Sequence, residues 1–461
     1  MALPRTTAAA DVFREYSIKT EGRVRSRHHP EYADWHKQTT WNGRSFARYP
    51  AYIVKACSEA DVVQAVEFAR SRRLRISVRG GGHSYSGCFL REGGILLDLS
   101  ALREISIDTS ARRAIVQPGV TSRELSVRLA RDNLAFPTGH GSEVAISGFL
   151  LGGGLGINCA AWGGMSVFNI KALDVVTADG RVRHISADSE PDLFWAARGG
   201  GPALFFAVIR FHLACQPLPR AITSNMYRAP FHKLPSLLTA IRQIQPPAQL
   251  QVMLAVIPGG GADQGRDVLL NTIAFADSTT HAKALHGALV SRLPGEWLTA
   301  IAEDEPSGFE SIYKQSDAML VSKRYRTDNI LTDDAEDAIA ILARHLPLQP
   351  SAASVPLIVW RGAPTYPDAA YSARGQFFLS TYAQWNDAED DDINRTWLKG
   401  LYDDLAAVAS GCYINEFDIE TRAAELERCF APENWRRIGE LRRRYDPDGV
   451  FQDVATLKPE S

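Results

Sequence analysis

The stretch from Gly139 to Gly156 constrains the fold of this chain most strongly. Seven of its 18 residues are glycine, and the others include the apolar residues Val144, Ile146 and Phe149. Glycine weakens a strand and adds no side chain to a core, so this stretch is not a core strand. Its apolar side chains do not fit a flexible surface loop either. A backbone that lies close to a large planar or phosphorylated ligand explains both features, and we predict a ligand-binding loop.

A second glycine-rich loop runs from Val78 to Gly87 and reads VRGGGHSYSG. Three successive glycines leave backbone N–H groups unshielded, and such groups can form a nest that binds phosphate oxygens. Arg79 adds a guanidinium whose fork geometry suits phosphate. The alternative is a plain turn between strands. The arginine before the glycines and the His83-Ser84 pair after them favour a ligand loop.

Neither loop matches the two common nucleotide-binding fingerprints. A Rossmann fingerprint needs GxGxxG. Counting from Gly80 places Tyr85 at the last glycine, and counting from Gly152 places Ile157 there. A P-loop needs Gly-Lys followed by Ser or Thr, and the sequence has no such triplet.

The composition fits a globular protein of two domains. The chain has 461 residues, more than one hydrophobic core normally holds. Its 51 Lys and Arg residues and 53 Asp and Glu residues give a formal net charge of -2, without the basic excess of a nucleic-acid binder. The six cysteines include no CxxC pair, so we predict free thiols and no metal site.

The sequence shows no signal for export or for a membrane. Met1 to Tyr16 contains charged residues and lacks the apolar core of a signal peptide. The longest apolar stretch, Val144 to Ile157, is too short to span a bilayer and is interrupted by glycines. We therefore expect a cytoplasmic protein with no membrane partner.

The first half of the chain alternates helical and strand patterns. Apolar residues at 62, 65, 66 and 69 lie on one face of a helix that Ser58 or Asp61 can cap. The run Thr121 to Glu124 has the form of a capping box and predicts another helix. Asp179 and Gly180 predict the turn of a hairpin over 173–185. The predicted strands are 75–78, 94–98 and 113–117.

Past about Phe211 the pattern changes. Prolines become more frequent, and short strand-like runs lie between longer helical stretches. This pattern predicts a second, α+β domain. In one run, the two-residue period of a strand places Ser380, Tyr382 and Gln384 on the same face. The predicted strands here include 250–257 and 376–382, and the predicted helices include 334–345 and 393–407.

Together, the motifs resemble the FAD-linked oxidases of the vanillyl-alcohol oxidase and p-cresol methylhydroxylase superfamily. The resemblance is greatest to the berberine-bridge-enzyme-like branch, which includes 6-hydroxynicotine oxidase and sugar oxidases. It covers nearly the whole chain. The matching segments are Arg79 to Ser84, Gln117 to Gly119, the 139–156 loop, Ala178 to Gly180, Asp192 to Trp195, Arg198 to Gly201, Tyr413 to Asn415 and Tyr445 to Phe451.

The resemblance implies an α+β fold of two domains. It predicts a PCMH-type FAD-binding domain over residues 45–215. A substrate domain over 216–408 would place an antiparallel sheet above the isoalloxazine ring. A C-terminal segment, 409–461, would return to the FAD-binding domain.

The resemblance also implies how FAD is held. In this family the histidine at the position of His83 is bonded to the 8α-methyl carbon of the flavin, although a lone histidine by itself would be a structural residue. Some members have a second bond from a cysteine where this chain has Gly141, so we predict one covalent tether, through His83 only. The predicted FAD-binding residues are Val78, Arg79, Gly80, Gly81, Gly82, His83, Ser84, Gly87, Cys88, Pro118, Gly119, Gly139, His140, Gly141, Val144, Ile146, Ser147, Gly148, Gly152, Gly153, Gly156 and Asn415.

The implied activity is oxidation of a small alcohol, sugar or amine by hydride transfer to flavin N5, with O2 as acceptor and H2O2 as product. The alternatives are a dehydrogenase with another acceptor and a flavin-bearing protein that sequesters a metabolite. The proton acceptor candidates are Tyr413, then Tyr382, then Glu416. Glu416 stands where the family commonly has a tyrosine, and Leu204 to Phe206 replaces its usual Asn-Phe-Gly. Substrate identity and oligomeric state are not predicted.

Overall fold

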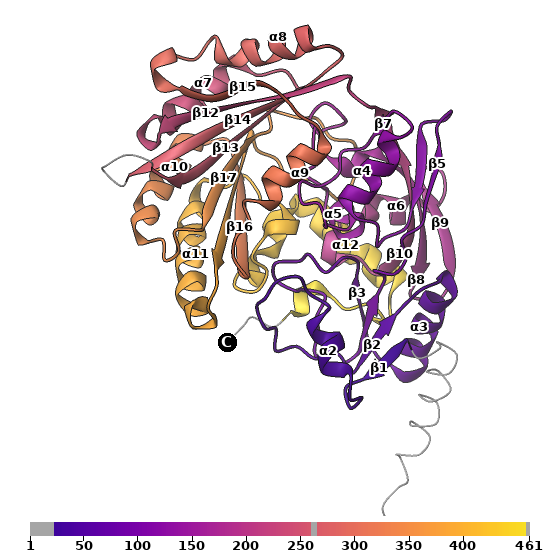
Figure 1. The fold of residues 1–461 in the computed structure, drawn as a ribbon. Coiled ribbons are helices and arrows are strands. Elements are labelled where there is room, and N and C mark those ends of the chain that lie inside the picture. Colours follow the sequence, from indigo (N-terminus) through magenta and orange to yellow (C-terminus); the bar gives the residue numbers. More distant parts are fainter. Residues whose placement is uncertain (1–22, 260–264, 458–461) are drawn as a thin grey trace, which may run out of the picture.

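The computed structural model describes residues 23–259 and 265–457. The N-terminal residues considered for a signal peptide lie outside these ranges. Two smaller sheets are built from the first half of the chain, and one large sheet is built from the middle. Figure 1 shows the smaller sheets at the right and the large sheet at the upper left.

Strands from the first half form a four-stranded and a five-stranded sheet. In the first sheet β2, β4 and β3 are parallel and β1 is antiparallel, and the second sheet is antiparallel throughout. A short pair, β7 (Leu134–Ala135) with β11 (Gln216–Pro217), lies apart from them. In spatial order the two sheets are β1 (Val24–Ser26), β2 (Tyr52–Lys55), β4 (Ile95–Asp98) and β3 (Ile76–Arg79), and then β5 (Ile105–Asp108), β6 (Arg113–Val116), β10 (Phe206–Ala214), β8 (Ile170–Thr177) and β9 (Val182–Ser186).

The large sheet has seven strands, all antiparallel to their neighbours. In β13 buried residues alternate with partly exposed ones, which is the pattern of a strand covered by helices on one face. The α+β fold with an antiparallel sheet in the second half is therefore confirmed. In spatial order the strands are β15 (Thr299–Pro306), β12 (Ala221–Pro230), β14 (Arg266–Ala276), β13 (Leu250–Pro258), β17 (Val355–Trp360), β18 (Phe377–Trp385) and β16 (Arg324–Thr332).

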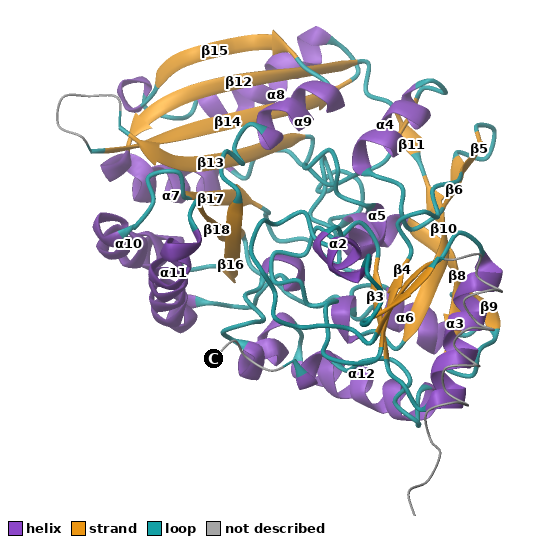
Figure 2. Ribbon diagram, turned by 60° about the horizontal axis from the view of Figure 1, so that its bottom comes forward, coloured by secondary structure: helices purple, strands orange, loops and turns teal. Residues whose placement is uncertain are grey.

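Helices cover the outer face of the large sheet and leave the other face turned toward the smaller sheets. α8 packs on β12 and β14, α11 packs on β16 and β18, and α7 and α10 connect these two helices. Loops are concentrated between the large sheet and the smaller ones (Figure 2). The helices are α2 (Tyr32–Lys37), α3 (Glu59–Arg72), α4 (Ser122–Ala130), α5 (Ile146–Leu151), α6 (Pro191–Ala197), α7 (Leu234–Ile244), α8 (Thr279–Val290), α9 (Phe309–Asp317), α10 (Ala335–His345), α11 (Asp391–Leu405) and α12 (Pro432–Tyr445).

Local capping signals determine where two of the helices begin. Ser58 caps α3, and Asp61 completes a capping box with it. Thr121 and Glu124 form the same arrangement at the start of α4. Each box satisfies backbone N–H groups that a helix start leaves without partners. The predicted capping box at Thr121 is confirmed, and of the two caps considered for α3 the structure shows Ser58 as the N-cap, with Asp61 completing a box.

The C-terminal segment contacts both halves of the molecule. Ser410 N and Leu331 N form backbone hydrogen bonds that join this segment to β16. Further along, Ile76 N donates to Val450 O, and Gln452 N donates to Ile76 O, both at 2.7 Å. The segment therefore adds a short parallel bridge at the free edge of β3.

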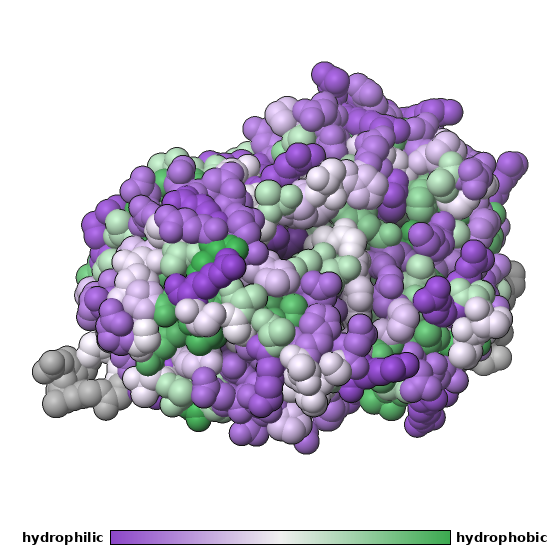
Figure 3. All heavy atoms as spheres, turned by 90° about the horizontal axis from the view of Figure 1, so that it is seen from above, coloured by the Kyte–Doolittle hydropathy of each residue, from purple (hydrophilic) through white to green (hydrophobic). Residues whose placement is uncertain are grey.

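The surface seen from above mixes polar and apolar residues without a single dominant apolar face (Figure 3). Within the described ranges, none of the helices is both long and apolar enough to cross a membrane.

Candidate active site

A cavity of about 790 Å³ is lined by the large sheet and the two glycine-rich loops. Its size falls in the range of cofactor and ligand sites. All three predicted proton acceptors line it, together with 16 of the 22 predicted FAD-binding residues. Those 16 are Val78, Arg79, Gly80, Gly81, Gly82, His83, Ser84, Cys88, Gly139, His140, Gly141, Val144, Ser147, Gly148, Gly156 and Asn415.

Six predicted FAD-binding residues do not line the cavity. A Cβ on Gly119 would lie 2.4 Å from Ser100 O, and one on Gly152 would lie 2.0 Å from Asn415 Oδ1. These glycines are required by close contacts within the protein. The six residues are Gly87, Pro118, Gly119, Ile146, Gly152 and Gly153.

The two glycine-rich loops lie in direct contact. A Cβ on Gly80 would lie 2.0 Å from Ser147 Oγ, and one on Gly81 would lie 2.6 Å from Ala145 Cβ. Ser147 Oγ is buried and has no hydrogen-bond partner within the part of the chain that is described. A bare backbone beside an unpartnered hydroxyl in a cavity suits the phosphates of a dinucleotide, so the residues present fit FAD.

Arg79 has a structural role that its sequence motif did not reveal. Its Nη1 donates to Asp98 Oδ1 at 2.6 Å, and its Nε donates to Thr39 O at 2.6 Å. Its remaining N–H groups point to the carbonyl oxygens of Gln38, Gly80 and Gly81. Asp98 and the loop carbonyls thus occupy donors of the guanidinium that the sequence motif had suggested for phosphate.

His83 lies in the cavity with its ring stacked on Trp41. The ring centroids are 5.0 Å apart and the planes differ by 12°, and Trp41 in turn stacks on Tyr325 at 4.7 Å. Burial, with a smaller contribution from Arg79, lowers the pKa of His83 to about 4. The imidazole is therefore neutral near pH 7. Within residues 23–259 and 265–457 its nitrogens have no hydrogen-bond partner.

Tyr413 and Asn415 attach the C-terminal segment to the 139–156 loop. Tyr413 Oη accepts from Leu155 N at 3.1 Å and from Asn415 Nδ2 at 2.9 Å. Asn415 Nδ2 also donates to Phe149 O at 3.0 Å. Burial raises the pKa of Tyr413, so this hydroxyl keeps its proton and holds the loop in place.

Glu416 accepts hydrogen bonds from the large sheet. Ser380 Oγ donates to Glu416 Oε2 at 2.6 Å, and Tyr382 Oη donates to the same oxygen at 3.0 Å. The period-two prediction that Ser380 and Tyr382 share a face of β18 is confirmed. Burial raises the pKa of Glu416, and burial together with the charge of Glu416 raises the pKa of Tyr382.

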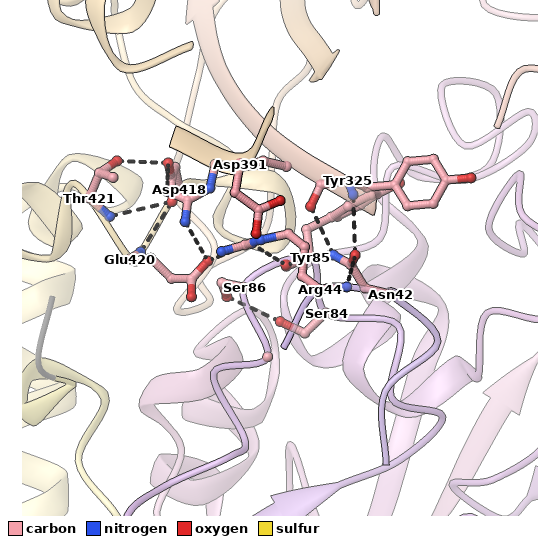
Figure 4. A network of polar contacts seen from close by, with 12 residues as sticks. Asn42, Arg44, Ser84, Tyr85, Ser86, Tyr325, Asp391, Asp418, Glu420 and Thr421 are labelled. Atoms are coloured by element: carbon pink, nitrogen blue, oxygen red, sulfur yellow. Dashed lines mark hydrogen bonds and ion pairs between the residues drawn. The ribbon is translucent and has the colours of Figure 1, made fainter. Parts of the chain in front are cut away.

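A buried polar network holds these segments together (Figure 4). Asn42 Nδ2 donates to Tyr85 O at 3.1 Å and to Tyr325 O at 2.8 Å. Arg44 Nη1 donates to Glu420 Oε2 at 2.8 Å. The network joins the segment that carries Trp41 to the His83 loop, to β16 and to the chain just after Glu416. It thereby fixes how these parts meet at the cavity.

Several cavity residues were not predicted from the sequence. Trp41, Gln251 and Arg361 line the cavity but lie in no recognisable motif, and Tyr85 lines it from within the first glycine-rich loop, where it was not singled out. Gln251 Nε2 lies 3.1 Å from His140 Nε2, which connects β13 to the second glycine-rich loop. Alternation along β13 and β17 could have placed Gln251 and Arg361 on the inner face of the large sheet, but only if the strand pairing had been known.

One group of potential metal ligands occurs in the described chain, outside the cavity. Asp174, His184 and His212 lie on neighbouring strands, with their ligand atoms within 4.8 Å of one another. Both imidazoles already hydrogen-bond to Asp174, at 2.7 and 3.2 Å. Arg210 Nη1 lies 3.6 Å from the same carboxylate. The group is thus a hydrogen-bonded cluster with a cation beside it.

Comparison with known proteins agrees with this geometry. Residues 50–186 match the family model described as an FAD binding domain. An FAD-linked oxidoreductase of Penicillium janthinellum is 28% identical over 439 residues, which are 91% of this chain and 93% of that protein. (R)-6-hydroxynicotine oxidase of Paenarthrobacter nicotinovorans is 38% identical over 185 residues, 40% of each chain.

Solved structures show the same fold. The 6-hydroxy-D-nicotine oxidase of Arthrobacter nicotinovorans superposes with a TM-score of 0.78 at 25% identity, over 95% of this chain and 98% of that one. The berberine bridge enzyme of Eschscholzia californica has a TM-score of 0.81 at 19% identity, over 98% and 99%. The chain therefore contains an FAD-binding domain, is similar along most of its length to FAD-linked oxidoreductases, and has the fold of 6-hydroxy-D-nicotine oxidase and the berberine bridge enzyme.

Proposed function

We propose that this oxidoreductase is an oxidase of a small alcohol, sugar or amine that passes electrons to O2 and releases H2O2. The observation that carries the proposal is the carboxylate of Glu416, which lies in the same cavity as the glycine-rich loops that fit FAD. Bound FAD supplies the redox chemistry, because its N5 accepts hydride and its electrons can pass to oxygen.

Glu416 is the proposed proton acceptor. Oxidation removes a hydride from the substrate carbon and a proton from the attached O–H or N–H, and a base must lie within hydrogen-bond reach of that proton. The raised pKa of Glu416 makes its carboxylate a stronger base than an exposed one. This ranking differs from the one that the sequence motif indicated. Tyr413 accepts two hydrogen bonds that hold the loop, and Tyr382 already donates to Glu416.

The polar partners of the carboxylate have a distinct role. Ser380 and Tyr382 both donate to Glu416 Oε2, which leaves Oε1 as the oxygen without a hydrogen bond from either of them. These two donors stabilise the ionised form and orient the carboxylate. The second oxygen can then receive the substrate proton.

We further propose that His83 forms the single covalent bond to FAD. To hold the flavin covalently, His83 would need an imidazole nitrogen with a free electron pair. The lowered pKa of His83 supplies a neutral ring, and its stacking on Trp41 fixes the plane of that ring. Gly141 provides no thiol for a second bond.

Covalent attachment is tested on denatured protein. We expect the protein band in a denaturing gel to show flavin fluorescence, and His83→Ala to abolish it. Fluorescence that persists in the variant would show that another side chain holds the cofactor.

The activity is tested with a panel of alcohols, sugars and amines, following flavin bleaching and peroxide formation together. We expect bleaching followed by peroxide release, with Glu416→Gln lowering kcat by about 10²- to 10⁴-fold. Bleaching without peroxide would identify a dehydrogenase with another acceptor. Tight binding without bleaching by any panel member would identify a sequestering protein.

A further inference from the structure

Arg361 is a buried cation on the sheet side of the cavity. It follows directly after β17 and is 9% exposed. Its backbone N–H donates to Gln376 O at 2.7 Å, so the pairing of β17 with β18 continues to this residue. Alternate residues of a strand share a face, and Val355, Leu357, Val359 and Arg361 all line the cavity.

The guanidinium of Arg361 contacts uncharged groups. Nη2 donates to Gly164 O, to the sulfur of Met165 and to Tyr366 Oη, each at 3.0 Å. Nη1 lies 3.9 Å from Cys159 Sγ. Among residues 23–259 and 265–457, no carboxylate forms an ion pair with this arginine.

A buried guanidinium without an anion is unusual. Arginine remains charged in proteins, and a buried charge is normally paired because its desolvation is costly. The other two arginines that line the cavity, Arg79 and Arg91, bind protein groups near the His83 loop. Arg79 pairs with Asp98, and Arg91 lies beside the His83 loop, where it donates to Asp453 O and to Thr456 Oγ1. Arg361 instead extends from the end of β17 to the segment that follows the second glycine-rich loop, where it contacts Gly164 and Met165.

The strand positions of Arg361 and of the residue pair that holds Glu416 indicate the kind of molecule that fits. Leu357 pairs with Ser380, and Ser380 is hydrogen-bonded to Glu416. Arg361 lies four residues beyond Leu357, which is about 13 Å along the strand. The cavity wall between them is apolar and is formed by Leu357, Val359 and Phe378.

We propose that the substrate of this enzyme is an elongated, mostly apolar organic acid whose carboxylate binds Arg361. Its alcohol or amine carbon lies at the opposite end of the site, beside Glu416. The two charged residues also orient the molecule, because Glu416 repels the carboxylate and Arg361 attracts it. This inference rests on the proposed function, since it assigns the substrate class of the same cavity.

The experiment measures binding separately from turnover. Holoprotein is titrated with benzoate, phenylacetate and cinnamate and with the corresponding primary amides, and the change in flavin absorbance reports the Kd. A charge-assisted bidentate contact is worth at least about tenfold in affinity, so each acid should bind at least that much more tightly than its amide. Arg361→Gln should remove this preference, and Arg361→Lys should retain part of it.

The control is Arg181→Gln, which makes the same charge change at a side chain that is 78% exposed on the β8–β9 turn. It should leave the acid-to-amide ratio of the wild-type protein unchanged. The wild-type ratio is itself a test that does not depend on any variant folding.

Three results would overturn the inference: equal binding of acids and amides, binding of neither, or an acid preference that survives in Arg361→Gln. A changed absorbance of the ligand-free flavin in Arg361→Gln, with the ratio intact, would assign the arginine to the cofactor instead. If the proposed function is wrong, the result is different: no alcohol, sugar or amine of the substrate panel bleaches the flavin, even if the acids bind more tightly than their amides.

Discussion

The buried ion pair between Arg422 and Asp328 gives the sharpest prediction about stability. Arg422 Nη1 lies 2.8 Å from Asp328 Oδ2, and each side chain is 1% exposed. Arg422→Met would leave the carboxylate of Asp328 buried without its cation. Removal of one partner of such a pair costs about 3–5 kcal/mol, and we expect the free energy of unfolding to fall by this amount near pH 8.

The loss of stability caused by Arg422→Met should depend on pH, and the structure determines whether it grows or shrinks as the pH rises. Burial raises the pKa of Asp328 to about 7 against the opposing effect of Arg422, and Asp418 raises it further. A folded-state pKa above that of the unfolded chain means that stability is lost as the pH rises through the folded value. Without Arg422 this pKa rises more. The variant should therefore lose less stability near pH 5, where Asp328 is protonated, than near pH 8.

Urea unfolding followed by tryptophan fluorescence, near pH 5 and near pH 8, measures both effects. The matched control is Lys399→Met, because Lys399 and its partner Asp403 are 46% and 45% exposed and such a pair contributes at most about 1 kcal/mol. Adding Asp328→Asn to Arg422→Met should recover part of the loss. A loss near pH 8 below about 1 kcal/mol, or an equal loss at both pH values, would refute the reasoning.

Three further predictions concern the cavity. Activity should fall as the pH drops through the raised pKa of Glu416. Ser380→Ala removes a hydrogen-bond donor to this carboxylate and should move the acidic limb of the kcat/KM profile to higher pH. An unmoved limb would argue against Glu416 as the proton acceptor. Gly81→Ala places a Cβ 2.6 Å from Ala145 Cβ and should yield protein with little bound flavin by absorbance, whereas Gly287→Ala, where nothing lies within 4 Å, should keep normal flavin content. Trp41→Ala removes the ring stacked on the predicted tether histidine and should slow covalent incorporation of added FAD in a gel-fluorescence time course, with Trp41→Phe retaining most of the rate.

Features that depend on neighbouring residues could be predicted from the sequence. The capping box at Thr121 and a cap on the helix after Ser58 could be predicted because in both cases the partners lie within three residues of each other. The two glycine-rich stretches do line one cavity, because bare backbone is needed wherever loops approach each other or a ligand. The C-terminal motif at Tyr413 to Asn415 also led to Glu416 as a candidate proton acceptor, although Tyr413 was the first choice.

Features that depend on distant contacts could not be predicted. Arg79 was assigned to phosphate because its partner, Asp98, lies on a parallel strand 19 residues later. Trp41 was missed because its stacking on His83 comes from tertiary packing across 42 positions, with no spacing rule behind it. Gly152 was placed in the FAD site, but its missing Cβ makes room for Asn415. A glycine motif therefore indicates a close approach without revealing what approaches.

The pairing of Ile76 with Val450 and Gln452 has a consequence for how the enzyme acquires its cofactor during synthesis. The edge of β3 that leads into the His83 loop stays open until residues 450–452 have been synthesised. Asn415 and Glu416, which also line the cavity, are likewise synthesised well after both glycine-rich loops. N-terminal parts of large proteins generally fold first, so the glycine-rich loops are formed before the C-terminal segment that completes the cavity. We therefore expect FAD to bind only after this segment has been synthesised, and we expect loss of the segment to weaken FAD binding before it unfolds the protein.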